Sequence, residues 1–152
     1  MKSLFKKVCI ASDHAGFNLK EHIKKFLIDI IEDENIIGQV KNDAAPYLKK
    51  EWEGLCMHPL VGEAKIVGMM GSIALTPNKE NRAPFKSDAG KVGYICRERC
   101  FANNLIMRHV GDRMIISPPL IITKSEIDLL IKRAKKALDE TFEKLMNEGL
   151  VS

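Results

Sequence analysis

The sequence predicts a protein of the α/β class, in which a small, largely antiparallel sheet is covered by helices on one face in an α+β arrangement. Three observations support this prediction. A capped amphipathic stretch at 123–149 predicts a long helix, two short apolar stretches around a Gly-Asp pair predict paired strands, and a glycine-rich apolar stretch at 61–75 predicts a further strand. A length of 152 residues is enough for about one core.

The first elements follow from a short apolar run and a polar turn. Residues 8–11 (VCIA) predict a buried strand, and the turn at 12–16 (SDHAG) leads into a helix that starts near Phe17. The far end of this helix carries the acidic residues 32–34, where negative charge opposes the helix dipole. We therefore expect the helix to break near 35–38.

Three further helices are predicted from apolar residues at helical spacing. The first covers 40–56, with a kink or a late start at Pro46 because proline has no backbone N–H, and it ends at the His-Pro pair 58–59. The second covers 90–103. The last begins at 123–126 (TKSE), where a threonine followed three residues later by a glutamate is typical of a capping box.

The strands are predicted from glycine-rich or short apolar stretches. Residues 61–75 contain too many glycines for a stable helix, so we expect one long strand, bulged at Gly68 or Gly71. Two short strands follow at 105–108 and 113–117, and the Gly-Asp pair between them favours a tight turn.

Composition limits the class of function. The chain is 45% apolar and 29% charged with a net charge of +4, and its cations are interleaved with anions, so we expect no nucleic-acid partner. No apolar run is long enough to cross a bilayer, and the basic start is not followed by the apolar core of a signal peptide. The missing apolar run predicts no membrane partner. The four cysteines favour reduced thiols in a cytoplasmic protein.

Arg108 is the main candidate for a binding residue. It lies among apolar residues just before the Gly-Asp turn, and a guanidinium stays charged at ordinary pH and needs an anionic partner. Two interpretations stay open: an ion pair with Asp112 or another surface carboxylate, or a clamp that holds a carboxylate-bearing ligand through two parallel hydrogen bonds.

Asp13 and His14 form a second candidate site at the predicted strand-to-helix turn. An aspartate and a histidine there can bind hydroxyl groups or exchange protons, but Ser12 or Asp13 can equally serve only as the N-cap of the helix. Cys96 and Cys100 lie four residues apart without further ligands at matching spacing, so we expect core thiols and no metal.

Residues 8–21 at the opening of the chain read VCIASDHAGFNLKE. This stretch resembles the start of ribose-5-phosphate isomerase B. In that family the Ser-Asp-His-Ala-Gly turn helps to hold the sugar, which makes Asp13 and His14 a possible sugar-binding remnant. The family's later segment with its catalytic cysteine has no match, so isomerase activity is the weakest hypothesis.

Most of the chain carries a series of motifs: HPLVGEA at 58–64, GMMG at 68–71, NNLIMR at 103–108, GD at 111–112 and SPPLIIT at 117–123. Together they resemble the C-terminal small domain of class III pyridoxal-phosphate-dependent aminotransferases, of the omega-amino acid:pyruvate type and fold type I. Arg108 matches the arginine that binds the substrate carboxylate in that family and swings aside for amines without one. The family's cofactor lysine and phosphate-binding residues belong to its large domain, so we expect no catalytic residue here and no pyridoxal 5'-phosphate bound to the chain alone.

Together the two resemblances predict a chimera of an isomerase-like start at 1–27 and an aminotransferase small domain at 28–152, joined within a helix. We expect a fragment that is inactive alone in transfer of an amino group to pyruvate-type keto acids, with a small carboxylate or amine as the substrate of the parent family. The alternative is a non-catalytic module that forms homo-oligomers through exposed apolar surface.

Overall fold

The computed structural model describes residues 12–151, which form two compact units that meet between Gly38 and Gln39. The predicted strand at 8–11 lies outside the described residues. In the first unit, helix α1 (Phe17–Asp33) begins where the sequence predicts. The helix breaks at Asn35, within the predicted range 35–38, because Asn35 adopts a left-handed φ of +48°. The chain returns to helix at once in α2 (Ile36–Gln39).

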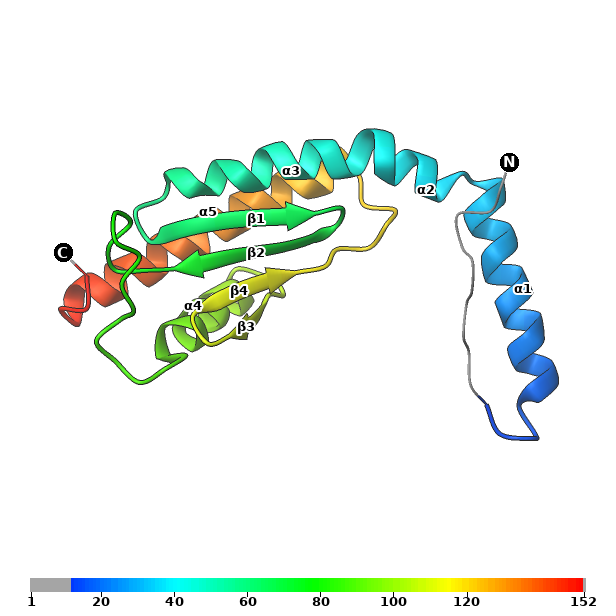
Figure 1. Cartoon of the computed structure of the whole chain (residues 1–152), viewed down its shortest axis with the longest axis horizontal. Coiled ribbons are helices and arrows are strands. Elements are labelled where there is room, and N and C mark those ends of the chain that lie inside the picture. The colour runs from blue at the N-terminus through cyan, green and yellow to red at the C-terminus, as the bar shows by residue number, and fades with distance from the viewer. Residues whose placement is uncertain (1–11, 152) are drawn as a thin grey trace. The chain divides into compact units, whose positions relative to one another are not determined.

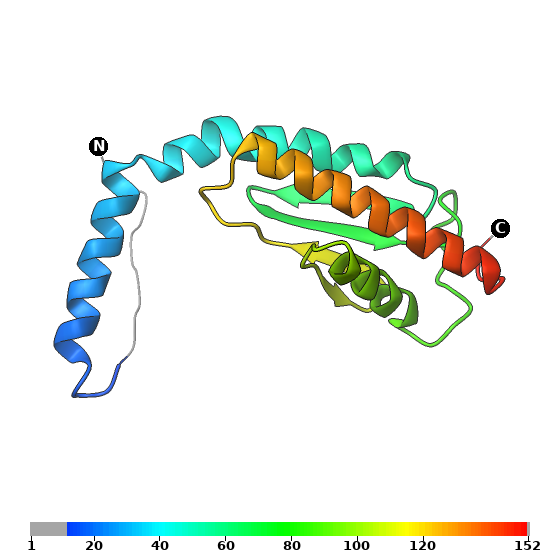
Figure 2. The same cartoon turned by 180° about the vertical axis from the view of Figure 1, so that it is seen from behind.

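The second unit contains a four-stranded antiparallel sheet with the strand order β1-β2-β4-β3. Three helices lie over one face of this sheet (Figures 1 and 2), which confirms the predicted fold class. The strands are β1 (Val61–Val67), β2 (Met70–Leu75), β3 (Arg108–Val110) and β4 (Arg113–Ile116). The covering helices are α3 (Ala45–Glu53), α4 (Lys91–Ala102) and α5 (Lys124–Asn147).

The helical stretch predicted at 40–56 is present but changes its geometry twice. A π-helical turn (Val40–Ala44) precedes α3, and a 3₁₀ turn (Gly54–Met57) follows it. Pro46 stands in the first turn of α3, where its missing N–H is tolerated. The predicted late start at Pro46 is wrong, because the chain is already helical from Ile36 and passes through a π-helical turn just before Pro46. The stretch ends before the His-Pro pair as expected.

The prediction of one long strand at 61–75 is wrong, because this stretch folds back on itself as the β1–β2 hairpin. Gly68 makes the turn with a φ of +57°, a conformation that favours glycine. The irregular register lies between Val61 and Glu63 instead. Gly71 has a packing role, since a Cβ there would lie 2.9 Å from Cε2 of Trp52.

The β3–β4 hairpin confirms the predicted Gly-Asp turn but shifts the first strand. β3 begins at Arg108, whereas the sequence predicts a strand at 105–108. Leu105 lies beyond α4 but is tied to its last turn, because its N–H donates to the carbonyl oxygen of Cys100 at 2.9 Å. The reason is the left-handed Asn104 (φ +55°), which turns the chain before pairing starts.

Helix α5 packs over the sheet and confirms its predicted cap. Glu126 N–H donates to Thr123 Oγ1, and Thr123 N–H donates to the Glu126 carboxylate at 2.8 Å. The thiols of Cys96 and Cys100 are buried and free, as predicted. The largest fully buried side chains of the core are Leu48, Trp52, Leu55, Leu60, Ile73, Met114, Ile127, Leu138 and Leu145. Among residues 12–151, no helix combines the length and apolarity that crossing a bilayer requires.

Candidate functional site

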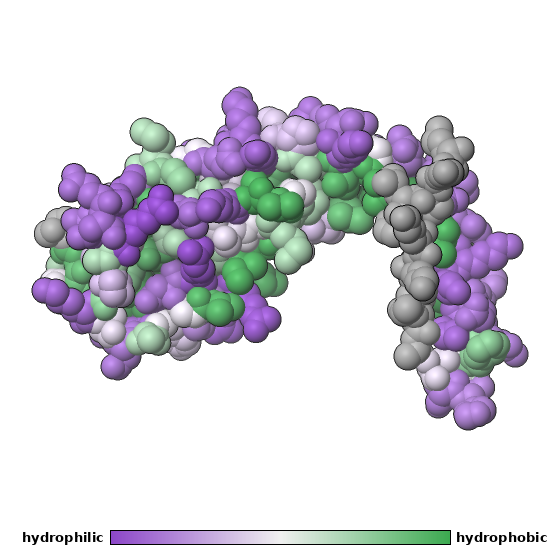
Figure 3. Space-filling view, in the orientation of Figure 1, coloured by the Kyte–Doolittle hydropathy of each residue, from purple (hydrophilic) through white to green (hydrophobic). Residues whose placement is uncertain are grey.

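The candidate site lies on the sheet face that the three helices leave open. Residues directly opposite each other on paired strands project to the same face. Figure 3 shows hydrophilic side chains beside hydrophobic ones in this region. One row across the open face is Glu63, Ala74, Arg113 and Val110, and the next is Lys65, Ser72, Ile115 and Arg108.

Arg108 is exposed on this face at the beginning of β3, opposite Ile115 on β4. No hydrogen bond or ion pair between residues of the described range 12–151 involves its side chain. The anticipated pairing with Asp112 is not formed, because the Asp112 carboxylate instead accepts the N–H of Gly93 at 2.9 Å. The Arg108 side chain is therefore exposed and unpaired among residues 12–151.

A second group of charges on the open face is centred on Glu63. Its carboxylate contacts Lys65 Nζ at 2.8 Å, Arg113 Nη1 at 3.3 Å and Arg82 Nη1 at 3.4 Å. The hydrogen bond from Lys65 lowers the pKa of Glu63, partial burial opposes that effect, and Arg113 adds to the lowering. Glu63 is therefore ionised at neutral pH.

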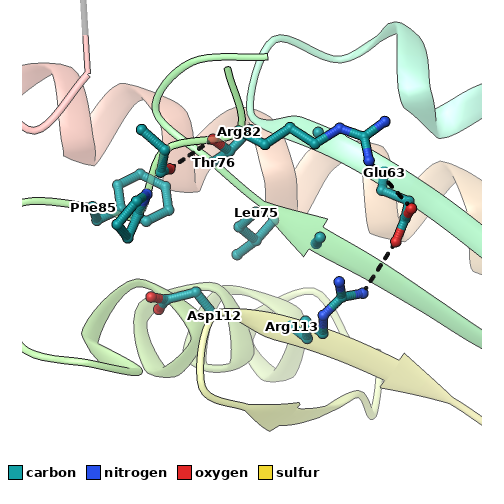
Figure 4. A pocket seen from close by; sticks show the side chains of 11 residues that line it. Glu63, Leu75, Thr76, Arg82, Phe85, Asp112 and Arg113 are labelled. Atoms are coloured by element: carbon teal, nitrogen blue, oxygen red, sulfur yellow. Dashed lines mark hydrogen bonds and ion pairs between the residues drawn. The ribbon is translucent and has the colours of Figure 1, made fainter. Parts of the chain in front are cut away.

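A cavity of about 330 Å³ adjoins this charge cluster. Figure 4 shows Arg82 and Arg113 reaching Glu63 from opposite sides, with Leu75 between them and Phe85 on the far wall. Sequence patterns do not reveal this pairing of arginines with Glu63, because Arg82 and Arg113 reach Glu63 only through the sheet register and the loop after β2. Alternation along β1 was the available signal, since it places Glu63 and Lys65 on one face.

Asp13 and His14 lie in the first unit, just before α1. The Asp13 carboxylate accepts the N–H of Gly16 at 2.8 Å, so it caps the turn that leads into the helix. His14 is exposed beside it. The N-cap of α1 is Gly16, without a side-chain hydrogen bond, so Asp13 does not take the predicted N-cap position. The Ser12 hydroxyl donates to the backbone carbonyl oxygen of Asp13 at 3.1 Å, so the turn is held by its own residues.

The described residues do not fit pyridoxal phosphate. A cofactor lysine needs a pocket in which its amine is free to form a Schiff base. Lys124 lines a cavity, but it is paired with Asp43 at 2.6 Å, and Lys144 is paired with Glu148 at 3.4 Å. Within 12–151 no three histidine, cysteine, aspartate or glutamate side chains cluster as a metal site would require.

The chain is similar to one part of known aminotransferases. It is 56% identical over 114 residues to putrescine–pyruvate aminotransferase of Pseudomonas aeruginosa, covering 75% of this chain and 25% of that protein. It is 32% identical over 114 residues to gamma aminobutyrate transaminase 3 of Solanum lycopersicum, covering 75% and 22%. The chain thus spans about a quarter of the length of the curated relatives it matches.

Solved structures agree with these relatives. The omega transaminase of Pseudomonas jessenii in complex with PMP superposes with a TM-score of 0.69 at 28% identity, over 76% of this chain and 25% of that one. No protein-family model matches the chain. The relatives and structural neighbours are thus class III aminotransferases of the omega transaminase type, and these matches do not show the isomerase-like start.

Proposed function

We propose that the chain contributes the substrate-carboxylate arginine, Arg108, of a class III aminotransferase and does not transfer amino groups by itself. The observation that carries the proposal is the exposed Arg108 on the open sheet face, without a partner among the described residues and within the motif at 103–108. The similarity to a putrescine–pyruvate aminotransferase supports a keto acid such as pyruvate as the ligand.

The chemistry of Arg108 suits this role. A guanidinium presents a planar fork of N–H donors that matches the two oxygens of a carboxylate. The β3–β4 pairing fixes the backbone of Arg108, while its long side chain has room to turn away over the open face. Arg108 would therefore bind and orient a carboxylate and withdraw from an amine that lacks one.

Amino transfer itself needs residues that the described range does not supply. Pyridoxal phosphate provides the electron sink of the reaction when it is bound, and a lysine must carry the proton. The lysines that line cavities here are held in ion pairs with carboxylates. We therefore propose inactivity of the chain alone, an origin in two parts joined near residue 27, and a cytoplasmic location in keeping with the free thiols.

The role of Arg108 can be tested by titrating the chain with pyruvate and following amide NMR shifts. Arg108→Gln should weaken pyruvate binding about tenfold, because it removes a charge-assisted pair of hydrogen bonds. Lys135→Gln, which removes an exposed cation from α5, is the matched control and should bind as the parent does. Equal binding by parent and Arg108→Gln would overturn the assignment.

Inactivity is tested by incubating the pure chain with pyridoxal phosphate, putrescine and pyruvate. The expected result is no internal aldimine absorbance and no alanine formed. Turnover above a heat-denatured control would overturn the proposal. A ribose-5-phosphate isomerase assay on the same preparation tests the third hypothesis, for which we expect no activity.

A second candidate function is self-association through the open face. Val67 and Met70 at the tip of the β1–β2 hairpin are 85% and 65% exposed, although apolar side chains of this size gain free energy when buried. Sedimentation velocity should show a concentration-dependent dimer that the double variant Val67→Lys, Met70→Lys abolishes. A monomer at all concentrations would refute this alternative.

A further inference from the structure

We propose that Arg82 and Arg113 form a second anion site in the cavity beside Glu63, separate from Arg108 and independent of the function proposed above. The ligand class is a small oxyanion, with phosphate and short carboxylates as the two possible sources. Three properties of the cavity support this inference. The charges around Glu63 do not balance, most N–H groups of the two arginines are unused, and hydrogen bonds hold the loop that carries Arg82.

The charges around Glu63 do not balance. One carboxylate contacts three cations, Lys65, Arg82 and Arg113, which leaves a local excess of positive charge. Asp112 also lines the cavity, but its carboxylate is engaged by the N–H of Gly93. Counting both carboxylates, the group still carries a formal charge of +1. An additional anion would therefore be attracted to the cavity.

Most of the hydrogen-bond donors of Arg82 and Arg113 are not used by Glu63. The Glu63 side chain is only 17% exposed, whereas those of Arg82 and Arg113 are 62% and 51% exposed. Each arginine contacts Glu63 through a single nitrogen, and the two contacts reach different carboxylate oxygens. Neither contact uses the paired geometry of a guanidinium fork, so most of the five N–H groups of each arginine remain available.

The loop that carries Arg82 is held in place by hydrogen bonds from a buried threonine. Buried Thr76 holds the loop after β2, with its hydroxyl 2.9 Å from the carbonyl oxygen of Asn78 and 3.0 Å from that of Ala83. Arg82 adopts a left-handed φ of +51°, which an arginine rarely does, and its N–H donates to Asn78. The hydrogen bonds of the loop thus hold Arg82 in a conformation that is rare for arginine.

The cavity would also shield a bound oxyanion from part of the solvent. Leu75 and Phe85 are buried and form an apolar wall beside the guanidinium groups. Charge-assisted hydrogen bonds are stronger where the surroundings are less polar. With a volume of about 330 Å³, the cavity has room for phosphate or a short carboxylate.

The site is tested with the 152-residue chain by calorimetric titration with inorganic phosphate and, separately, with acetate. Arg82→Gln and Arg113→Gln should each weaken binding about tenfold, because each removes a charge-assisted donor. Glu63→Gln should strengthen binding several-fold, because it removes the carboxylate that competes for both arginines. Tighter binding of phosphate than of acetate identifies phosphate as the source, and the reverse identifies a carboxylate.

The opposite sign expected for Glu63→Gln separates an anion site from a structural ion-pair cluster. If the cluster only holds the loop, all three variants lower the melting temperature and none binds phosphate or acetate more tightly, which overturns the proposal. Lys135→Gln, which removes an exposed cation from α5, is the control and should leave phosphate binding here unchanged. Loss of phosphate binding in Arg108→Gln alone would also overturn the second site, while leaving the role proposed for Arg108 intact.

Discussion

At the scale of single residues, His58 makes the fold sensitive to pH. Its Nδ1 accepts the N–H of Leu60 at 3.1 Å, and its Nε2 faces Asp139 at 3.2 Å. Its ring also packs edge-on against Phe142. Burial lowers the pKa of His58 below 6.5, although Asp139 opposes that effect. The folded state therefore binds this proton less readily than the unfolded state does.

The sign of the pH effect follows by linkage. Because the folded pKa is lower than the unfolded one, stability falls as the pH drops through 6.5 toward the folded value. Urea denaturation at pH 7 and pH 5 should show a larger loss of unfolding free energy in the parent than in His58→Gln, which cannot titrate. An equal loss in both proteins would show that other groups account for the acid sensitivity.

At the scale of elements, the contact between α4 and the β3–β4 turn depends on Gly93. A Cβ there would lie 2.1 Å from the carbonyl oxygen of Gly111, and the N–H of Gly93 donates to Asp112. Gly93→Ala should therefore destabilise the fold by about 3 kcal/mol or more, because backbone atoms must move to make room. Gly54→Ala is the matched control, since its Cβ would meet nothing within 4 Å.

The two glycine variants are compared by chemical denaturation at one pH. Gly54→Ala should be neutral or stabilising by about 0.5 kcal/mol, because alanine reduces the freedom of the unfolded chain. Equal unfolding free energies for Gly93→Ala and the parent would show that the turn yields at little cost. Amide NMR shifts at Asp112 then reveal where the turn has moved.

Elements with a local signal could be predicted from the sequence. The capping box at Thr123 and the Gly-Asp turn at 111–112 each reside within a few residues, and both are confirmed. The β1–β2 hairpin was missed because its turn pairs Gly68 with an apolar residue, Met69, which carries no common turn signal. A glycine inside an apolar run is equally compatible with a bulge.

In the candidate site too, residues with a local sequence signal could be predicted and residues brought together by distant contacts could not. Arg108 could be identified from its neighbours in the sequence and from the family motif. Glu63 meets Arg82 across 19 residues and Arg113 across 50, so their convergence depends on strand register and on the course of a loop. Periodicity places each side chain on a face, but it does not indicate which distant side chain will lie opposite.

At the scale of the whole molecule, the chain divides at a different place from the join inferred by resemblance. The boundary between the compact units falls between Gly38 and Gln39 along the chain, whereas the resemblance places the join near residue 27. A change of ancestry within a helix leaves no structural boundary, because helical geometry continues across it. The two boundaries thus describe different properties, one the packing of the chain and the other its inferred origin.

The second unit should fold without the first. All buried members of its apolar core lie between Ala44 and Leu145, and the partly buried residues packed on them start at Val40. A chain that begins at Gln39 therefore retains the described core. Its melting temperature should lie within a few degrees of that of the full chain, with cooperative unfolding in both. A broad transition in the shortened chain, or loss of its tertiary circular dichroism signal, would show that residues before Gln39 contribute to this core.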